Sequence, residues 1–282
     1  MTAGPVWVKS DRQRERERIL ASQGRRTTSI ATASTILFVA LAGVVVINSP
    51  GWPRVRDTFF DPEMFLRAAP AVAEGFLVNI KIFLIAEPLI LAVGLVVALI
   101  RGTRSPALFP VRALATLYVD TFRGVPTLLV ILMVGFGLPA LKLQGVPADL
   151  TTLGVIALTL SYGAYVAEVF RSGIESIHPS QVAAARSLGL SHGKTLRFVV
   201  LPQAARRVVV PLLNDFVSLQ KDTALVSTIG LVEALRQAQI ITSQTFNYTP
   251  YLVASLLFIL LTIPLARYTD HLAARARRRQ GS

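Results

Sequence analysis

Runs of about twenty apolar residues restrict the fold of this chain more than any other feature. A helical run of about this length crosses the hydrocarbon core of a bilayer. Because lipid offers backbone N–H and C=O groups no partner, a spanning segment has to pair them within itself, as a helix does. We therefore predict an all-α membrane protein with about six transmembrane helices, at residues 29–49, 76–100, 124–141, 150–170, 206–228 and 249–267.

The amino-acid composition supports a membrane protein. Of the 282 residues, 52% are apolar and 16% are charged, whereas soluble domains carry about 25% charged residues. The chain contains no cysteine, and its three histidines, His178, His192 and His271, are isolated from one another. This composition excludes disulfides and offers no cluster of metal ligands. We predict neither a metal site nor catalytic residues.

The first apolar run follows an arginine-rich start, as the apolar region of a signal peptide does. Residues 29–47 are too long for such a region, and the turn at residues 48–52 follows them where a cleavage site would stand. We predict that this run is a retained spanning helix.

The distribution of Lys and Arg predicts the orientation of the chain. Six spans place both termini on one side, and 22 of the 29 Lys and Arg residues then lie on that side, against five on the other. Because cytoplasmic loops are enriched in Lys and Arg, we predict a multi-pass protein of the cell membrane with both termini in the cytoplasm. Basic residues at this surface contact anionic lipid, which makes lipid a predicted partner and argues against nucleic acid.

The longest cytoplasmic loop, residues 171–207, contains the pattern of a short capped helix. Pro179 and Ser180 suit its first positions, and Gly189 suits its C-terminal cap. A second short helix is predicted to start at Ser191 and to stop before Pro202. A small-residue helix of this kind either enters a groove on another protein or packs on its own bundle, and the spacing leaves both interpretations open.

Residues 181–189 read Gln-Val-Ala-Ala-Ala-Arg-Ser-Leu-Gly, and Leu-Pro-Gln follows at 201–203. This pattern resembles the "EAA" loop of permease subunits in ATP-binding-cassette importers, in which the loop is a coupling helix seated in a cleft of the ATPase subunit. Residues 122–126, 165–173, 211–214 and 219–225 resemble the type I importers of polar amino acids such as histidine, glutamate, glutamine and arginine. The resemblance covers residues 72 to 270 in the right order.

The resemblance implies a non-enzymatic transport subunit with a five-helix core and one extra N-terminal helix. It implies separate ATPase subunits, a second permease subunit of the same or a sister kind, and an external solute-binding protein as partners. It also implies import of a polar amino acid, with glutamate or glutamine suggested by general likeness. The ATPase-coupling residues implied are Ser180, Gln181, Ala183, Ala184, Ala185, Arg186, Gly189 and Pro202. Ala183 departs from the family pattern, which has Glu there.

The implied domain organisation has five parts. They are a cytoplasmic basic segment (1–28), the extra helix (29–49), a periplasmic or extracellular segment (50–71) containing a short surface helix, the permease domain (72–270) and a basic tail (271–282).

A near match to a phosphate-binding loop occurs after the capped helix. Gly189 and Gly193 precede Lys194 and Thr195, but only three residues separate the glycines, and the motif requires four. We predict no cofactor on this chain and assign ATP hydrolysis to another subunit.

Charged residues inside predicted spans are costly and usually face protein or water. Glu87 either lines the solute path or is paired within the bundle, with Lys81 as a candidate partner. Asn214, Ser218 and Lys221 share one helical stripe. With Asp222 they are predicted to border the translocation path, as the resemblance implies for the fifth span.

Glu168 and Arg171 are three residues apart near the cytoplasmic end of the fourth span. Residues at this spacing meet on a helix surface, and we predict a structural pair near the coupling loop.

Two other functions are compatible with a membrane chain. A self-sufficient secondary transporter or channel predicts inverted repeats or interrupted helix pairs, and no internal repeat is visible. An intramembrane protease needs a paired nucleophile and base or metal ligands, and no predicted span contains His or Cys. The importer subunit is the preferred interpretation.

Overall fold

The computed structural model describes residues 10–103, 105–145 and 147–278, and every regular element in these ranges is helical. The predicted all-α class is confirmed. Four helices are long and apolar enough to cross a membrane, or five if one bent helix pair counts as a single span. Residues 201–222 carry too many charged side chains to meet that test, so the span predicted at 206–228 remains a prediction.

The chain divides into two units, which meet between Asp57 and Thr58. The first contains α1 (Asp11–Ile47), a 37-residue helix whose N-terminus is closed by Ser10 and Gln13 in a capping box. The apolar part, Thr27–Ile47, has no buried residue within its unit, as expected of a helix surrounded by lipid. α1 runs through the predicted boundary at residue 28. Residues 1–9 of the basic segment and 279–282 of the tail lie outside the described residues.

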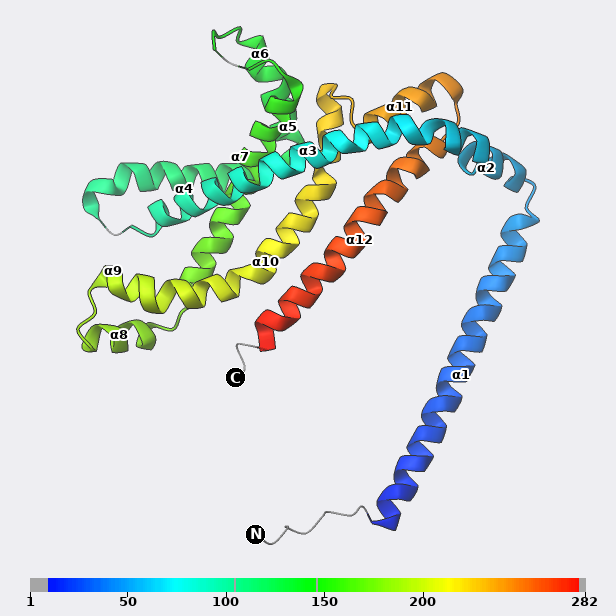
Figure 1. Cartoon of the computed structure of the whole chain (residues 1–282), viewed down its shortest axis with the longest axis horizontal. Helices are drawn as coiled ribbons and strands as arrows, with labels where there is room; N and C mark the ends of the chain where they lie inside the picture. The colour runs from blue at the N-terminus through cyan, green and yellow to red at the C-terminus, as the bar shows by residue number, and fades with distance from the viewer. Residues whose placement is uncertain (1–9, 104, 146, 279–282) are drawn as a thin grey trace. The chain divides into compact units, whose positions relative to one another are not determined.

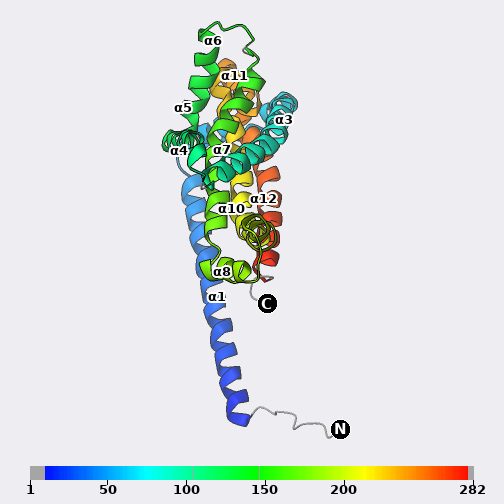
Figure 2. The same cartoon turned by 90° about the vertical axis from the view of Figure 1, so that its left-hand side faces the viewer.

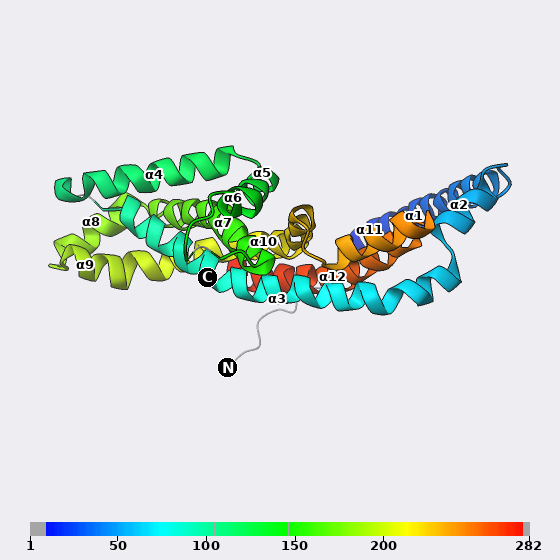
Figure 3. The ribbon, with the colours of Figure 1, turned by 90° about the horizontal axis from the view of Figure 1, so that it is seen from above.

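The second unit is a bundle in which α7 packs against α3, α4 and α10, and α10 lies between α7 and α12 (Figures 1 and 2). Seen from above, α4 and α9 lie at opposite edges (Figure 3). The elements are α2 (Trp52–Phe59), which crosses the unit boundary, α3 (Pro62–Arg101), η1 (Pro106–Leu108), α4 (Phe109–Gly124), α5 (Thr127–Leu132), η2 (Met133–Gly137), α6 (Leu138–Ala140), α7 (Leu150–Glu175), α8 (Pro179–Ser187), α9 (His192–Thr195), η3 (Leu196–Val200), α10 (Leu201–Asp222), η4 (Thr223–Ile229), α11 (Ala234–Thr245) and α12 (Thr249–Arg278). η1 and η4 are 3₁₀ helices, and η2 and η3 are π-helical.

α3 begins at Pro62, within the segment 50–71 that we predicted as an external connection containing a short surface helix. The Asp61 side chain accepts hydrogen bonds from the N–H groups of Glu63 and Met64 and so caps a helix that begins at Pro62. This early part of α3 is helical because Ala68 and Val72 are buried in an apolar cluster with residues of α11 and α12.

The segment 101–123, predicted as a loop, is also mostly helical. α4 and α5 are bent by 108° at Val125–Pro126. Proline lacks an N–H group and disfavours the α conformation in the preceding residue, and Val125 is extended (ψ 131°). The predicted span 124–141 is therefore the second arm of a bent helix pair.

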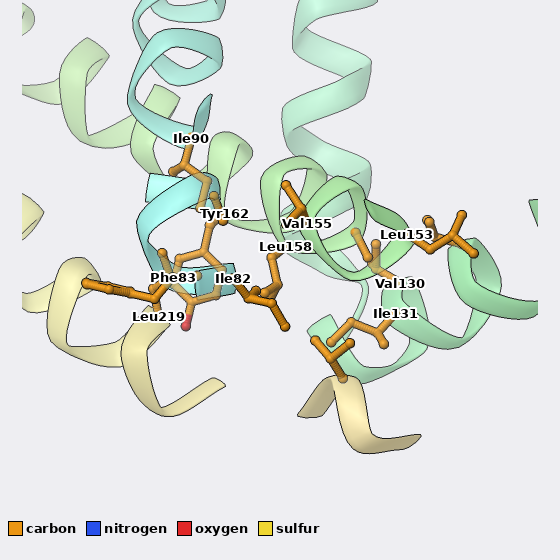
Figure 4. Close-up of a cluster of buried hydrophobic side chains, with 14 of the residues drawn as sticks. Ile82, Phe83, Ile90, Val130, Ile131, Leu153, Val155, Leu158, Tyr162 and Leu219 are labelled. Atoms are coloured by element: carbon orange, nitrogen blue, oxygen red, sulfur yellow. The ribbon is translucent and has the colours of Figure 1, made fainter. Parts of the chain in front are cut away.

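The main core joins α3, α5, α7 and α10 (Figure 4). It contains Ile82, Phe83 and Ile90 of α3, Val130 and Ile131 of α5, Leu153, Val155, Leu158 and Tyr162 of α7, and Leu219 of α10. Glycines bring the helices close together: a Cβ atom on Gly154 would lie 2.6 Å from Val226 Cγ1, and one on Gly94 would lie 2.5 Å from Val166 Cγ1. Small residues at helix contacts are typical of membrane proteins, in which packing has to replace the hydrophobic effect.

Candidate functional site

The predicted capped helix is α8, and it begins and ends where the sequence predicts. His178 precedes it, and its Nδ1 accepts a hydrogen bond from the Ser180 N–H at 3.2 Å. At the C-terminal end the Gly189 N–H donates to the Arg186 carbonyl (3.0 Å) and the Leu190 N–H to the Ala185 carbonyl (3.2 Å). This is a Schellman motif, with Gly189 at φ +82°.

Most of the surface of α8 is exposed. Ala185 is buried, whereas Gln181, Ala183, Ala184 and Arg186 are exposed, and α8 packs mainly against α9 and η3 of its own loop. Leu188, next to the capping glycine, is 84% exposed. Covering such a side chain contributes about 1.5–3 kcal/mol when it is removed fully from water. Our sequence analysis missed Leu188, although an apolar residue just before a capping glycine in a polar loop could have indicated it.

We predicted that the second helix of the loop stops before Pro202, and this prediction is wrong. α9, capped by Ser191, continues through the π-helical η3 directly into α10. Proline removes one helical hydrogen bond, and the wider π turn lies immediately before it. α8 is therefore joined to α10 through α9 and η3.

The predicted pair of Glu168 and Arg171 belongs to a larger network between α3 and α7. The Glu168 carboxylate accepts hydrogen bonds from Arg101 Nη1 (2.9 Å) and Arg171 Nε (3.0 Å), and Arg171 also pairs with Glu175. Arg207 of α10 donates to the Ser176 carbonyl at 2.6 Å. The sequence indicated only the local pair, because Arg101 lies far from Glu168 along the chain.

The predicted polar stripe of α10 divides into two parts. Asn214 and Lys221 are exposed and Ser218 is partly exposed, so these three side chains face away from the core. Asp222 instead accepts a hydrogen bond from the Tyr162 hydroxyl of α7 at 2.7 Å.

Glu87 is half-buried on α3. Within the described ranges no ion pair joins it to Lys81. Six residues correspond to about 240° around a helix, so the two side chains point in different directions.

A second polar cluster, which the sequence analysis missed, lies where α10 ends. Asn79 of α3 and Glu233 before α11 are both buried and joined by a hydrogen bond of 2.9 Å. Burial raises the pKa of the Glu233 carboxyl, against the opposing effect of hydrogen bonds from the Leu235 and Arg236 N–H groups and the Asn79 side chain. A lone Asn in an apolar run and an acidic residue before a helix were the available indications.

Asp149 caps α7, and hydrogen bonds from the Thr152 N–H and hydroxyl lower the pKa of its carboxyl. Among the side chains that the structure describes, no three His, Asp or Glu residues are grouped as metal ligands.

Comparison with known proteins gives consistent matches. Residues 90–278 match the family model described as binding-protein-dependent transport system inner membrane component. The probable glutamine ABC transporter permease protein GlnP of Bacillus subtilis (strain 168) is 36% identical over 206 residues, which are 72% of this chain and 92% of that protein. The arginine transport system permease protein ArtQ of the same organism is 34% identical over 70% of this chain and 88% of its own.

Solved structures resemble this chain over about three quarters of its length. A crystal structure of an amino acid ABC transporter with histidines matches with a TM-score of 0.69 and 31% identity, over 76% of this chain and 98% of that chain. The MetNI methionine ABC transporter matches with a TM-score of 0.61 over 73% of this chain and 96% of its own, and at 15% identity it shows a shared fold.

Proposed function

The chain belongs to the family of binding-protein-dependent transport system inner membrane components, and from this membership we propose how it acts as the permease subunit of an ATP-driven importer of a polar amino acid. Separate ATPase subunits dock on α8 from the cytoplasm, where both termini also lie, and an external binding protein delivers the solute. The observation that supports this proposal most directly is α8 itself, a capped helix with an exposed Ala183–Ala184 face and an exposed Leu188.

Work done by the ATPase is passed on through α9 and η3. Closure of the ATPase on ATP displaces α8, and the continuous connection moves α10. The bonds from Arg207 to Ser176 and from Arg101 to Glu168 extend the displacement to α7 and α3. ATP thereby shifts the population between inward-open and outward-open arrangements.

The solute path runs along the exposed stripe of α10. Polar side chains inside a spanning segment usually face protein or water in place of lipid, and we assign Asn214, Ser218 and Lys221 to such a surface. We propose that a second permease subunit completes the path on this side. Glu87 and Asp222 are proposed to line it as well, since both are only half-buried.

The proposed substrate is a polar amino acid, with glutamine or glutamate first. Two relatives are named for glutamine and arginine. The decisive measurement is which amino acids, presented on the binding protein, stimulate ATP hydrolysis by the reconstituted complex. Stimulation by an apolar amino acid or a sugar alone would contradict the proposal.

Ala184→Trp tests the docking surface. Ala184 is exposed on α8, and an indole there prevents close approach of a partner, so we expect loss of ATPase subunits from the purified permease. Gln244→Trp is the control, because Gln244 is exposed on α11, far from the loop; it should retain them. Equal recovery of ATPase with both variants would place docking elsewhere.

A further inference from the structure

A buried polar clamp lies at the end of α10 remote from α8. Asn79, Thr223 and Glu233 are at most 2% exposed. The Asn79 Nδ2 group donates to Glu233 Oε2 (2.9 Å) and to Thr223 Oγ1 (3.2 Å), and Asn79 Oδ1 accepts from the Ala234 N–H (3.2 Å). One side chain on α3 thus holds the start of η4 and the start of α11.

The Glu233 carboxylate is the costly member of this clamp. Burying an ionised group is unfavourable unless hydrogen bonds compensate for the lost hydration. Its two oxygens accept from the Arg236 N–H (2.8 Å), the Leu235 N–H (3.0 Å) and Asn79. The backbone of α3 also approaches closely, since a Cβ on Gly75 would lie 2.7 Å from the Glu233 carbonyl carbon. The contact between α3 and the start of α11 is therefore close and held by hydrogen bonds.

The segment held at both ends, Thr223–Glu233, has one packed side and one open side. Val226 contacts Gly154 of α7, and Ile229 contacts Gly135 of η2, so closely that neither glycine accommodates a Cβ atom. Thr228 and Gly230 are exposed. Gly230 takes φ +93°, which turns the chain from η4 toward α11. The segment is a short strap across the bundle.

The strap follows the polar stripe of α10 directly, because Thr223 comes two residues after Lys221. α10 has 22 residues, or about 33 Å of helix, which is close to the thickness of the hydrocarbon core. Figures 1 and 2 show α8 and α11 at opposite ends of the second unit. The strap therefore lies at the end of the path away from the ATPase.

α3 connects the strap to the coupling side. Its Arg101 is bonded to Glu168 of the charge network, and its Asn79 is bonded to both ends of the strap. Pro88 lies between these residues, but the helix is continuous.

We propose that Asn79 and Glu233 are positioning residues that hold Thr223–Glu233 as a gate over the outer end of the solute path and move it with α3. This inference rests on the proposed function, since it requires the ATPase to act at α8.

Cysteine labelling tests the gate in the complete complex. The chain has no cysteine, so Thr228→Cys provides a single reactive thiol on the permease. The rate of its reaction with a maleimide is measured in nanodiscs with binding protein and substrate, without nucleotide and after trapping with ATP and vanadate. We expect a severalfold difference between the two states. Equal rates in an importer that still takes up substrate would overturn the gate and leave the proposed function intact, whereas loss of the ATPase from the unsubstituted permease would contradict the function itself.

Substitutions in the clamp test the role of the two residues. Asn79→Asp places a second carboxylate next to Glu233. We expect it to abolish the difference in labelling rate between the two states. Adding Glu233→Gln restores a donor facing an acceptor and should restore the difference. If Asn79→Asp alone is not recovered as folded protein, Glu233→Gln alone should weaken the difference. Labelling like that of the Thr228→Cys parent in the clamp variants would overturn the assignment.

Two controls separate a gate from general effects. Gln244→Cys on α11 is exposed and should react equally in both states; a change matching that of Thr228→Cys would mean shielding by the docked binding protein and overturn the gate. Thr262→Val removes the Thr262–Gln220 hydrogen bond (2.7 Å) at the same end of α10 and should preserve the state dependence. Loss of the state dependence in Thr262→Val would show that the effect is not specific to Asn79 and Glu233, and would overturn their role.

Discussion

Individual glycines set the distances between helices in this bundle. The absence of a side chain at Gly154 lets Val226 approach α7, and Gly135 does the same for Ile229. Each contact joins the η4 strap to the bundle and buries apolar surface from both sides. The sequence alone did not identify these glycines, because a glycine in an apolar run has the same appearance whether or not another helix packs on it.

Gly154→Ala is expected to destabilise the protein. Its Cβ would lie 2.6 Å from Val226 Cγ1, and overpacking of this kind costs about 1–3 kcal/mol. Gly137→Ala is the matched control, because nothing lies within 4 Å of its Cβ position and its φ of −69° is helical; there alanine should stabilise by about 0.4–1 kcal/mol. Thermal unfolding in detergent compares the two variants, and equal melting temperatures would contradict this account of the packing.

The sequence predicted best those helices whose first and last residues are set by neighbouring residues in the chain. α8 has its proline start and glycine end within a few residues, so its bounds were readable. α4 was missed because the charged residues of its sequence suggested a loop, whereas burial of Ala115 and Val119 and packing on α7 make it a helix. The continuity of α9, η3 and α10 was also missed, because a π turn before Pro202 has no simple sequence pattern.

Gly189→Val tests whether the end of α8 matters for coupling. A β-branched residue at φ +82° is strained by about 1–3 kcal/mol, which disrupts the Schellman motif and displaces Leu188. We expect several-fold less substrate taken up per ATP hydrolysed, at an unchanged amount of protein in the membrane. Gly193→Val is the control, because Gly193 also lies in open space without a positive φ. Normal coupling in Gly189→Val would remove the capped helix from the mechanism.

At the scale of the whole molecule, the second unit has a coupling end and a gate end joined by α10 and α3. The charge network with Arg207 and Ser176 lies toward the loop, and the Asn79–Glu233 clamp lies at the other end. The sequence indicated the class, the loop and the stripe, since these depend on composition, periodicity and local motifs. It did not indicate the bonds of Arg101 and Asn79 with α7, η4 and α11, because partners distant along the chain become apparent only once the helices are packed.

Lys221 lies at the gate end of α10, as the last residue of the exposed stripe before the strap. Lys221→Met removes the charge but keeps the length of the side chain. If Lys221 lines a hydrated path, uptake should fall by about tenfold, which corresponds to about 1.4 kcal/mol, while protein level and ATPase binding stay unchanged. Lys81→Met is the matched control, because Lys81 is also an exposed lysine on a membrane helix but lies outside the stripe; its uptake should remain near that of the parent. Equal losses in the two variants would indicate a general requirement for positive charge, and poor membrane insertion of Lys221→Met alone would assign Lys221 a structural role in place of one in the path.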